Sequence, residues 1–201
     1  MDKFNLIRSL REKGFSEKVL QACTKVDRID FTPKKYLEKA YVDIPIPLGH
    51  GSTISQPSTI LAMLDALDIQ LGNKILEIGT GSGYTSTLLS ELTGEDGEVI
   101  TLEVSPIILE YAKQKIRKKN IKIKHADGSQ GCPEEAPFDR IIVTAGCPVI
   151  PEKLVEQLKN KGKMVIPLGE GVQRMYLIEK ENNKINQKYI GEFIFVPLKK
   201  K

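Results

Sequence analysis

From residue 74 onward, short apolar segments alternate with segments of helical character. Strands are expected at 74–79, 98–103, 121–127, 138–146 and 162–169, and helices at 84–92, 105–119 and 151–159. Such alternation predicts a parallel sheet with helices on its faces. Two of the expected strands contain the continuously apolar runs IIV and MVI, as is typical of strands buried on both faces. The fold class is therefore α/β, with a doubly wound, mostly parallel sheet.

The two ends of the chain differ from this pattern. Residues 2–25 have helical spacing and are expected to form two helices, broken near Gly14. Residues 31–58 hold four of the eleven prolines, so they are expected to be mostly extended or looped, and an amphipathic helix is expected from Ser58 to about Leu67. Segments 174–180 and 188–198 are expected to form an antiparallel strand pair at the end. A chain of 201 residues suits one domain, here with a helical and loop extension at 1–70 and a core at 71–201.

The stretch LEIGTGSGY (76–84) lies where the first strand becomes a helix. Glycine at positions 79, 81 and 83 permits a tight turn and close approach of a ligand, and the following helix N-terminus favours a negative group. Glu103 ends the second strand, and Asp127-Gly128 ends the third. The carboxyl ends of parallel strands lie along one rim, where ligands bind. Together these features predict a cofactor site.

This combination resembles the S-adenosylmethionine site of the Rossmann-like methyltransferases. The resemblance implies that the methionine portion lies near the glycine loop, the ribose on Glu103 and the adenine by the third strand, with Asp127 reading its amino group. The cofactor-binding residues expected are Ser58, Glu77, Gly79, Thr80, Gly81, Gly83, Glu103, Asp127 and Gly128.

The run GHGSTISQPS (49–58) contains two glycines and four hydroxyl side chains, but no carboxylate, lysine or cysteine. It could be a plain loop. Backbone N–H groups and hydroxyls can, however, hold an anion without changing its protonation. Pro57 fits the first position of a helix, which leaves the amides of Ser58 and Thr59 available to an anion.

Three stretches together resemble the protein-L-isoaspartate O-methyltransferase family: AYVDIPIPLGHGSTISQPS, DRIIVTAGCPVIP and the closing FIFVPL, within residues 20–198. The family methylates the free α-carboxylate of isoaspartyl residues in damaged proteins and peptides, and the ester then cyclises to a succinimide. The resemblance implies that Ser55 is catalytic. It also implies that Thr53, Ile54, Ala145 and Pro197 bind substrate. His50, Ser52 and Ser58 depart from the residues common in the family, which bears on substrate preference and rate.

The residues suit this reaction. A carboxylate is already ionised at neutral pH, so it needs placement beside the methyl group rather than a general base. Ser55 is expected to donate a hydrogen bond to that carboxylate. It is not expected to act as an acyl nucleophile, because the chain has no GxSxG elbow. The alternative role for Ser55 is a helix-capping hydroxyl.

Two other function classes compete with this interpretation. Transfer-RNA methyltransferases have a similar GTGSG loop, and the net charge of +4 is compatible with nucleic acid. The stretch TAGCPVIP after the fourth strand, however, offers no aromatic side chain to stack a base, so no nucleic-acid partner is expected. The third possibility is a cofactor-binding module without catalysis. The lysine clusters at 113–120 and 199–201 are most simply a solvated surface.

The remaining features concern the environment of the chain. Three widely spaced cysteines without a Cys/His cluster predict no disulfide framework and no metal site. The charged start has no apolar stretch of a signal peptide, and no apolar run is long enough to span a membrane. We therefore expect a cytoplasmic enzyme, monomeric and not associated with a membrane.

Overall fold

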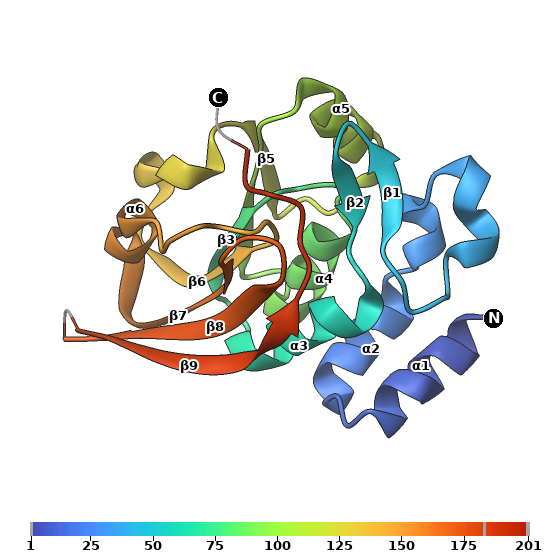
Figure 1. The fold of residues 1–201 in the computed structure, drawn as a ribbon, viewed down its shortest axis with the longest axis horizontal. Coiled ribbons are helices and arrows are strands. Elements are labelled where there is room, and N and C mark those ends of the chain that lie inside the picture. Colours follow the sequence, from blue (N-terminus) through green and yellow to red (C-terminus); the bar gives the residue numbers. More distant parts are fainter. Residues whose placement is uncertain (1, 183, 200–201) are drawn as a thin grey trace.

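The computed structural model describes residues 2–182 and 184–199. The N-terminal part contains helices α1 (Lys3–Glu12) and α2 (Glu17–Lys25), followed by 3₁₀ turns at Arg28–Phe31 and Lys34–Lys39. A small antiparallel hairpin of β1 (Ile46–Gly49) and β2 (Ser52–Ile54) then leads into α3 (Pro57–Leu67). The two predicted N-terminal helices and their break near Gly14 are confirmed. Figure 1 shows α1–α3 gathered on one side of the molecule.

The rest of the chain builds the main sheet. Its elements are β3 (Lys74–Ile78), α4 (Tyr84–Thr93), β4 (Glu98–Glu103), α5 (Pro106–Lys115), β5 (Ile121–His125), β6 (Phe138–Val143), α6 (Glu152–Glu156), β7 (Leu158–Leu168), β8 (Gln173–Glu181) and β9 (Lys184–Phe193). In the described part of the chain, seven strands pair in the order β5-β4-β3-β6-β7-β8-β9. The first five are parallel, and β8 is antiparallel to both of its neighbours. The predicted fold class, including the antiparallel ending, is confirmed.

The order of the strands reverses beside β3, because β4 and β5 lie on one side of it and β6 on the other. Such a reversal leaves a crevice at the carboxyl ends of the central strands, where ligands of open α/β sheets bind. The loops that follow β3, β4 and β6 therefore meet at the place where a cofactor site was expected.

Both faces of the sheet are buried. Successive side chains of a strand point to opposite faces, and Ile75 and Val99 belong to one hydrophobic cluster while Leu76 and Ile100 belong to another. The first cluster also contains buried side chains of α1, α2, α3 and α4. The N-terminal extension thus shares its core with one face of the sheet. No helix within the described residues is long and apolar enough to cross a membrane.

Local sequence signals begin two helices as expected. Pro57 occupies the first turn of α3. Ser105 precedes Pro106 in α5, and its hydroxyl accepts a hydrogen bond from the amide of Ile108 at 3.5 Å. The Ser105 hydroxyl thus gives one of the unpaired amides at a helix N-terminus a partner, and proline in the first turn has no N–H that would need one.

Helix α6 is shorter than predicted. A helix over 151–159 was expected, but it ends at Glu156, and β7 begins at Leu158 instead of residue 162. Tertiary contacts explain the difference: Phe138 pairs with Leu158, and its amide donates to the carbonyl of Gln157 at 2.9 Å. The Gln157 side chain accepts from the Cys132 amide at 2.7 Å. Strand pairing therefore outweighs helix propensity here.

Two further boundaries differ from the prediction. The helix expected over 105–119 ends at Lys115, because the following Ile116 turns extended. The final strand expected over 188–198 is displaced, with β9 ending at Phe193. Residues 194–199 instead form a separate segment, which is called the C-terminal segment below.

Candidate active site

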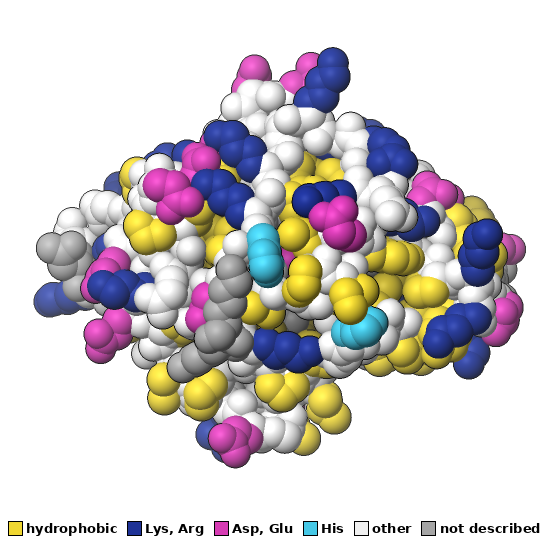
Figure 2. Space-filling view, turned by 90° about the horizontal axis from the view of Figure 1, so that it is seen from above, with side chains coloured by type: hydrophobic (Ala, Val, Ile, Leu, Met, Phe, Trp, Pro, Cys, Tyr) yellow, Lys and Arg dark blue, Asp and Glu magenta, His cyan; other side chains and the backbone are white. Residues whose placement is uncertain are grey.

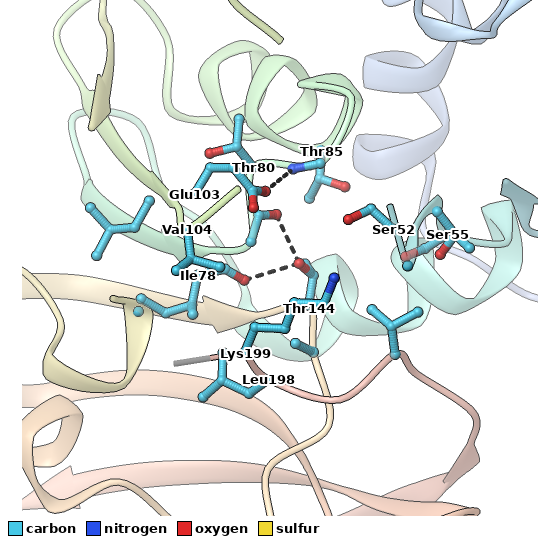
Figure 3. A pocket seen from close by; sticks show the side chains of 18 of the residues that line it. Ser52, Ser55, Ile78, Thr80, Thr85, Glu103, Val104, Thr144, Leu198 and Lys199 are labelled. Atoms are coloured by element: carbon cyan, nitrogen blue, oxygen red, sulfur yellow. Dashed lines mark hydrogen bonds between the residues drawn. The ribbon is translucent and has the colours of Figure 1, made fainter. Parts of the chain in front are cut away.

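One pocket lies at the carboxyl ends of the central strands, as predicted from the topology. Its empty volume is about 740 Å³ when the open mouth is included. Six regions far apart in sequence form its walls: the β1–β2 hairpin with the residues after it, the glycine loop, the end of β4, Gly128 after β5, the end of β6, and the C-terminal segment. Figure 3 shows Thr80 and Glu103 on one side, Ser52 and Ser55 across from them, and Lys199 and Leu198 below.

The glycine loop connects β3 to α4 in a left-handed backbone conformation. Gly79, Gly81 and Gly83 have φ angles of 96°, 54° and 86°, which glycine adopts without steric cost. Gly79, Thr80 and Gly81 line the pocket, as expected. A Cβ on Gly79 would lie 2.6 Å from Thr144 Oγ1, so this glycine also permits close packing against the end of β6.

Glu103 at the end of β4 is 7% exposed and faces the pocket. One carboxylate oxygen accepts from the Gly81 amide at 3.1 Å, and the other accepts from the Ser105 amide at 3.0 Å. These bonds fix the carboxylate against the glycine loop. Each oxygen keeps a further lone pair for a hydroxyl of a ligand.

Ser55 lies in the pocket wall together with Thr53 and Ile54. Its backbone is held by Arg28, a side chain only 2% exposed, whose Nη2 donates to the Ser55 carbonyl at 3.1 Å and to the Ile44 carbonyl at 2.9 Å. Burial lowers the pKa of this guanidinium, although arginine stays protonated in proteins. Arg28 thereby ties the segment that carries Ser55 to the preceding loop.

The opposite wall consists of the end of β6 and the C-terminal segment. Thr144 Oγ1 lies 3.0 Å and 2.9 Å from the carbonyls of Ile78 and Gly79. Gly146 donates to the Val196 carbonyl and accepts from the Leu198 amide, both at 2.9 Å. This short ladder holds Pro197 beside Ala145, and both line the pocket as predicted.

Gln173, at the start of β8, fastens the C-terminal segment from behind. Its side chain is 3% exposed, accepts from the Phe195 amide at 2.7 Å and donates to the Phe195 carbonyl at 3.5 Å. A Cβ on Gly146 would lie 2.8 Å from Gln173 Nε2. The glutamine therefore packs closely against both strands of the short ladder.

Four residues expected to bind the cofactor lie outside the pocket lining. Glu77 directly precedes the pocket residue Ile78 on β3, so its side chain points to the opposite face of the strand. There it is fully buried and accepts hydrogen bonds from Ser86 and Thr101. Burial raises the pKa of Glu77 to about 8. Gly83 is placed for packing, since a Cβ there would lie 2.6 Å from Ile116.

The other two are Ser58 and Asp127. The expectation that the Ser58 amide is available to an anion is wrong, because it donates to Asp43 Oδ1 at 2.8 Å. Asp127 caps the turn that follows β5 and accepts from the Ser129 amide at 2.9 Å. Its neighbour Gly128 does line the pocket.

Several lining residues were not predicted. Ser52 and Gly51 lie in the hydroxyl-rich run without having been assigned a role, and Thr85 directly follows the glycine loop, so both local motifs could have indicated them. Thr144 and Lys199 carry no local signal. The sequence indicates a solvated basic tail at 199–201, and the last two of these residues lie outside the described part of the chain.

The residues present suit S-adenosylmethionine. A fixed carboxylate at a strand end suits a ribose diol, and Val104 and Leu102 beside it offer apolar surface for a base. The hairpin side offers hydroxyls and backbone amides, and no cluster of potential metal ligands occurs within the described residues.

Comparison with known proteins decides the family. The family model for protein-L-isoaspartate(D-aspartate) O-methyltransferase matches residues 1–201. The chain belongs to this family. A relative named protein-L-isoaspartate O-methyltransferase from Methanopyrus kandleri is 43% identical, over 96% of this chain and 89% of that protein.

Solved structures of protein-L-isoaspartate O-methyltransferases resemble the fold of this chain and support the same assignment. One is 31% identical with a TM-score of 0.90, covering 98% of this chain and 65% of that chain. Another, from Plasmodium falciparum in complex with S-adenosyl-L-homocysteine, is 28% identical with a TM-score of 0.87 and covers 98% of both chains. The predicted enzyme class and its cofactor, S-adenosylmethionine, are confirmed, and the nucleic-acid methyltransferase alternative is not favoured.

Proposed function

We propose that this chain transfers a methyl group from S-adenosylmethionine to the α-carboxylate of L-isoaspartyl residues in damaged proteins, with Ser55 as the residue that orients the carboxylate. The proposal rests on one observation: two walls of different chemical character face each other across one pocket. Glu103 and the glycine loop form one wall, and the hydroxyl-bearing run Ser52–Ser55 forms the other. The first suits a nucleoside, and the second suits an anion.

When bound, S-adenosylmethionine supplies a methyl group on a positively charged sulfur. Transfer would join a carboxylate oxygen of the substrate to the methyl carbon, would leave the electron pair of the former sulfur–methyl bond on sulfur, and would move no proton. The chain therefore has to position and desolvate its substrate. In this proposal Ser55 donates to the carboxylate, Thr53 and Ile54 contact the peptide from the hairpin side, and Ala145 and Pro197 contact it from the opposite wall.

On the cofactor side, Glu103 accepts hydrogen bonds from the ribose, and Gly79, Thr80 and Gly81 surround the methionine portion. Gly128 lets the adenine approach the end of β5. Asp127, at the turn that follows β5, reads the adenine amino group. We further propose that the chain acts as a cytoplasmic monomer without a nucleic-acid partner. Its three cysteines are buried thiols, which is compatible with a reducing compartment.

The decisive experiment uses one peptide synthesised in two forms, with isoaspartate and with aspartate at the same position. Radiolabelled methyl transfer is expected to the isoaspartyl form, in a bond that mild base hydrolyses, and far less to its twin. Equal labelling of the two peptides, or label that survives base, would contradict the proposal. Transfer to unmodified transfer RNA instead would favour the nucleic-acid alternative.

A further inference from the structure

Lys199 is an unexpected cation in the pocket wall. Of the described residues that line the pocket, Glu103 and Lys199 are the charged ones. Glu103 stands at the cofactor end with both oxygens engaged by backbone amides. Lys199 stands at the hairpin end, where Nζ donates to the His50 carbonyl at 2.5 Å. A Cβ on Gly51 would lie 2.9 Å from the same nitrogen.

The backbone fixes the base of this side chain. The ladder between Gly146 and the C-terminal segment ends with the Leu198 amide, one residue before Lys199. From there the side chain extends across the pocket toward the side that carries Ser52 and Ser55 (Figure 3). The ammonium group is therefore directed toward the wall where the reacting carboxylate is proposed to bind.

The charge of Lys199 has no acidic partner among the residues that the structure describes. Within the described residues no carboxylate lies within ion-pair distance of it, and its hydrogen bond goes to a neutral carbonyl. An ammonium group has three donors, so two remain after the bond to His50. The side chain is exposed, and it can therefore adjust its position without breaking the fold.

We infer that Lys199 attracts the α-carboxylate of the isoaspartyl residue and distinguishes it from the neutral methyl ester. This inference rests on the proposed function, because it assumes that the anion binds on the hairpin side. Before transfer, the substrate is an anion and the ammonium favours its binding. After transfer, the ester is neutral and that attraction is lost. Lys199 thus favours substrate over product, while the hydroxyl of Ser55 orients the reacting oxygen.

The test compares binding of an acid with binding of its neutral twin. The ligands are one isoaspartyl peptide and the same peptide with an α-carboxamide, each titrated into protein saturated with S-adenosyl-L-homocysteine so that no turnover occurs. The proteins are wild type, Lys199→Met, which keeps the length of the stem, and Lys199→Arg, which keeps the charge. Lys188→Met is the control, since Lys188 is an exposed lysine of β9 outside the pocket lining.

We expect Lys199→Met to weaken binding of the acid about two- to fivefold, as for loss of an exposed ion pair, and to leave binding of the carboxamide unchanged. Lys199→Arg and Lys188→Met should bind both peptides as wild type does. Raising the salt concentration should reduce the wild-type preference for the acid and leave the methionine variant unaffected. Affinity for S-adenosyl-L-homocysteine should be equal in all four proteins.

Two results would overturn the inference alone. Equal weakening of both peptides in Lys199→Met would mean that Lys199 only fastens the C-terminal segment to the hairpin. Unchanged binding of the acid would mean that its charge does not reach the substrate. A wild-type enzyme that fails to methylate the isoaspartyl peptide would instead contradict the proposed function, and the inference with it.

Discussion

The surroundings of Ser55 separate it from a nucleophilic serine. Among the described residues that line the pocket there is no histidine to act as a base, and a carboxylate substrate requires none. We expect Ser55→Ala to lower kcat/KM about 10- to 1,000-fold, the scale of a lost transition-state hydrogen bond. Affinity for S-adenosyl-L-homocysteine, measured by calorimetry, should stay within twofold. Full activity of the alanine variant would show that the hydroxyl does not contact the reacting group.

Glu103 is the corresponding residue on the cofactor side. Glu103→Ala removes the acceptor proposed for the ribose hydroxyls, so we expect it to weaken S-adenosyl-L-homocysteine binding by about 1–3 kcal/mol. The control is Glu98→Gln at the other end of the same strand, where the side chain pairs with Lys74 and Lys122 away from the pocket. Calorimetry measures the affinity of both variants for S-adenosyl-L-homocysteine. Equal affinity of wild type and Glu103→Ala would exclude the contact between Glu103 and the ribose.

Residues that carry a local signal were predictable, and residues brought in from elsewhere in the chain were not. The glycine loop and Glu103 follow from the position of a motif relative to strand ends. Glu77 was assigned to the pocket because it lies in the motif, although strand alternation alone places it on the face opposite to Ile78. Lys199 could not be found this way, because its position depends on the contacts of Gln173 and Gly146.

At the scale of elements, the C-terminal segment is held to the pocket by its backbone ladder with Gly146 and by the buried side chain of Gln173. Gln173→Ala would leave the buried amide and carbonyl of Phe195 without their partner. We expect a loss of about 1–3 kcal/mol in the free energy of unfolding. We also expect a raised KM for the isoaspartyl peptide, because Val196–Lys199 line the pocket.

Urea unfolding and steady-state kinetics measure the two effects. Gln187→Ala on the exposed part of β9 is the matched control and should change neither quantity. If Gln173→Ala were destabilised with an unchanged KM, the glutamine would support the fold without positioning the substrate wall.

The elements themselves were largely predictable, and their ends were not. Helix starts follow from short-range signals such as Ser105 and Pro57, whereas α6 gives way to β7 because β6 supplies a pairing partner for Leu158. The β1–β2 hairpin was expected only as extended or looped chain. Its turn includes His50 at a φ of 50° and Gly51 at 68°, a conformation that residue type does not specify uniquely.

At the scale of the whole molecule, the pocket depends on the packing of the N-terminal extension against the sheet. Side chains of α1–α4 form one cluster with Ile75, Val99 and Val165 of the sheet, and Arg28 ties the hairpin side to this body. Figure 2 shows the molecule from above, with hydrophobic side chains exposed between charged ones on that face. Sequence motifs predicted which segments take part, but their mutual placement requires this shared core.

The buried Glu77 links that core to pH. Its pKa of about 8 lies above the ordinary value of 4.5 because burial disfavours the charged form, against the opposing hydrogen bonds of Ser86 and Thr101. Between these two pH values the folded state keeps a proton that the unfolded state has released. The free energy of unfolding should therefore fall as the pH rises from about 5 to 8, by up to about 1.4 kcal/mol per pH unit.

Glu77→Gln keeps the shape and the acceptor oxygen but cannot ionise. We expect its stability to match that of wild type near pH 5 and to exceed it increasingly toward pH 8. Urea unfolding at a series of pH values shows how the free energy of unfolding changes with pH in wild type and in Glu77→Gln. The control Glu192→Gln, an exposed change on β9, should show the same pH dependence as wild type. Because Glu77 lies behind the glycine loop and joins it through Thr101 and Thr80, its ionisation would also disturb the cofactor wall. Parallel slopes for wild type and Glu77→Gln would mean that this carboxylate is already ionised in the folded protein at neutral pH.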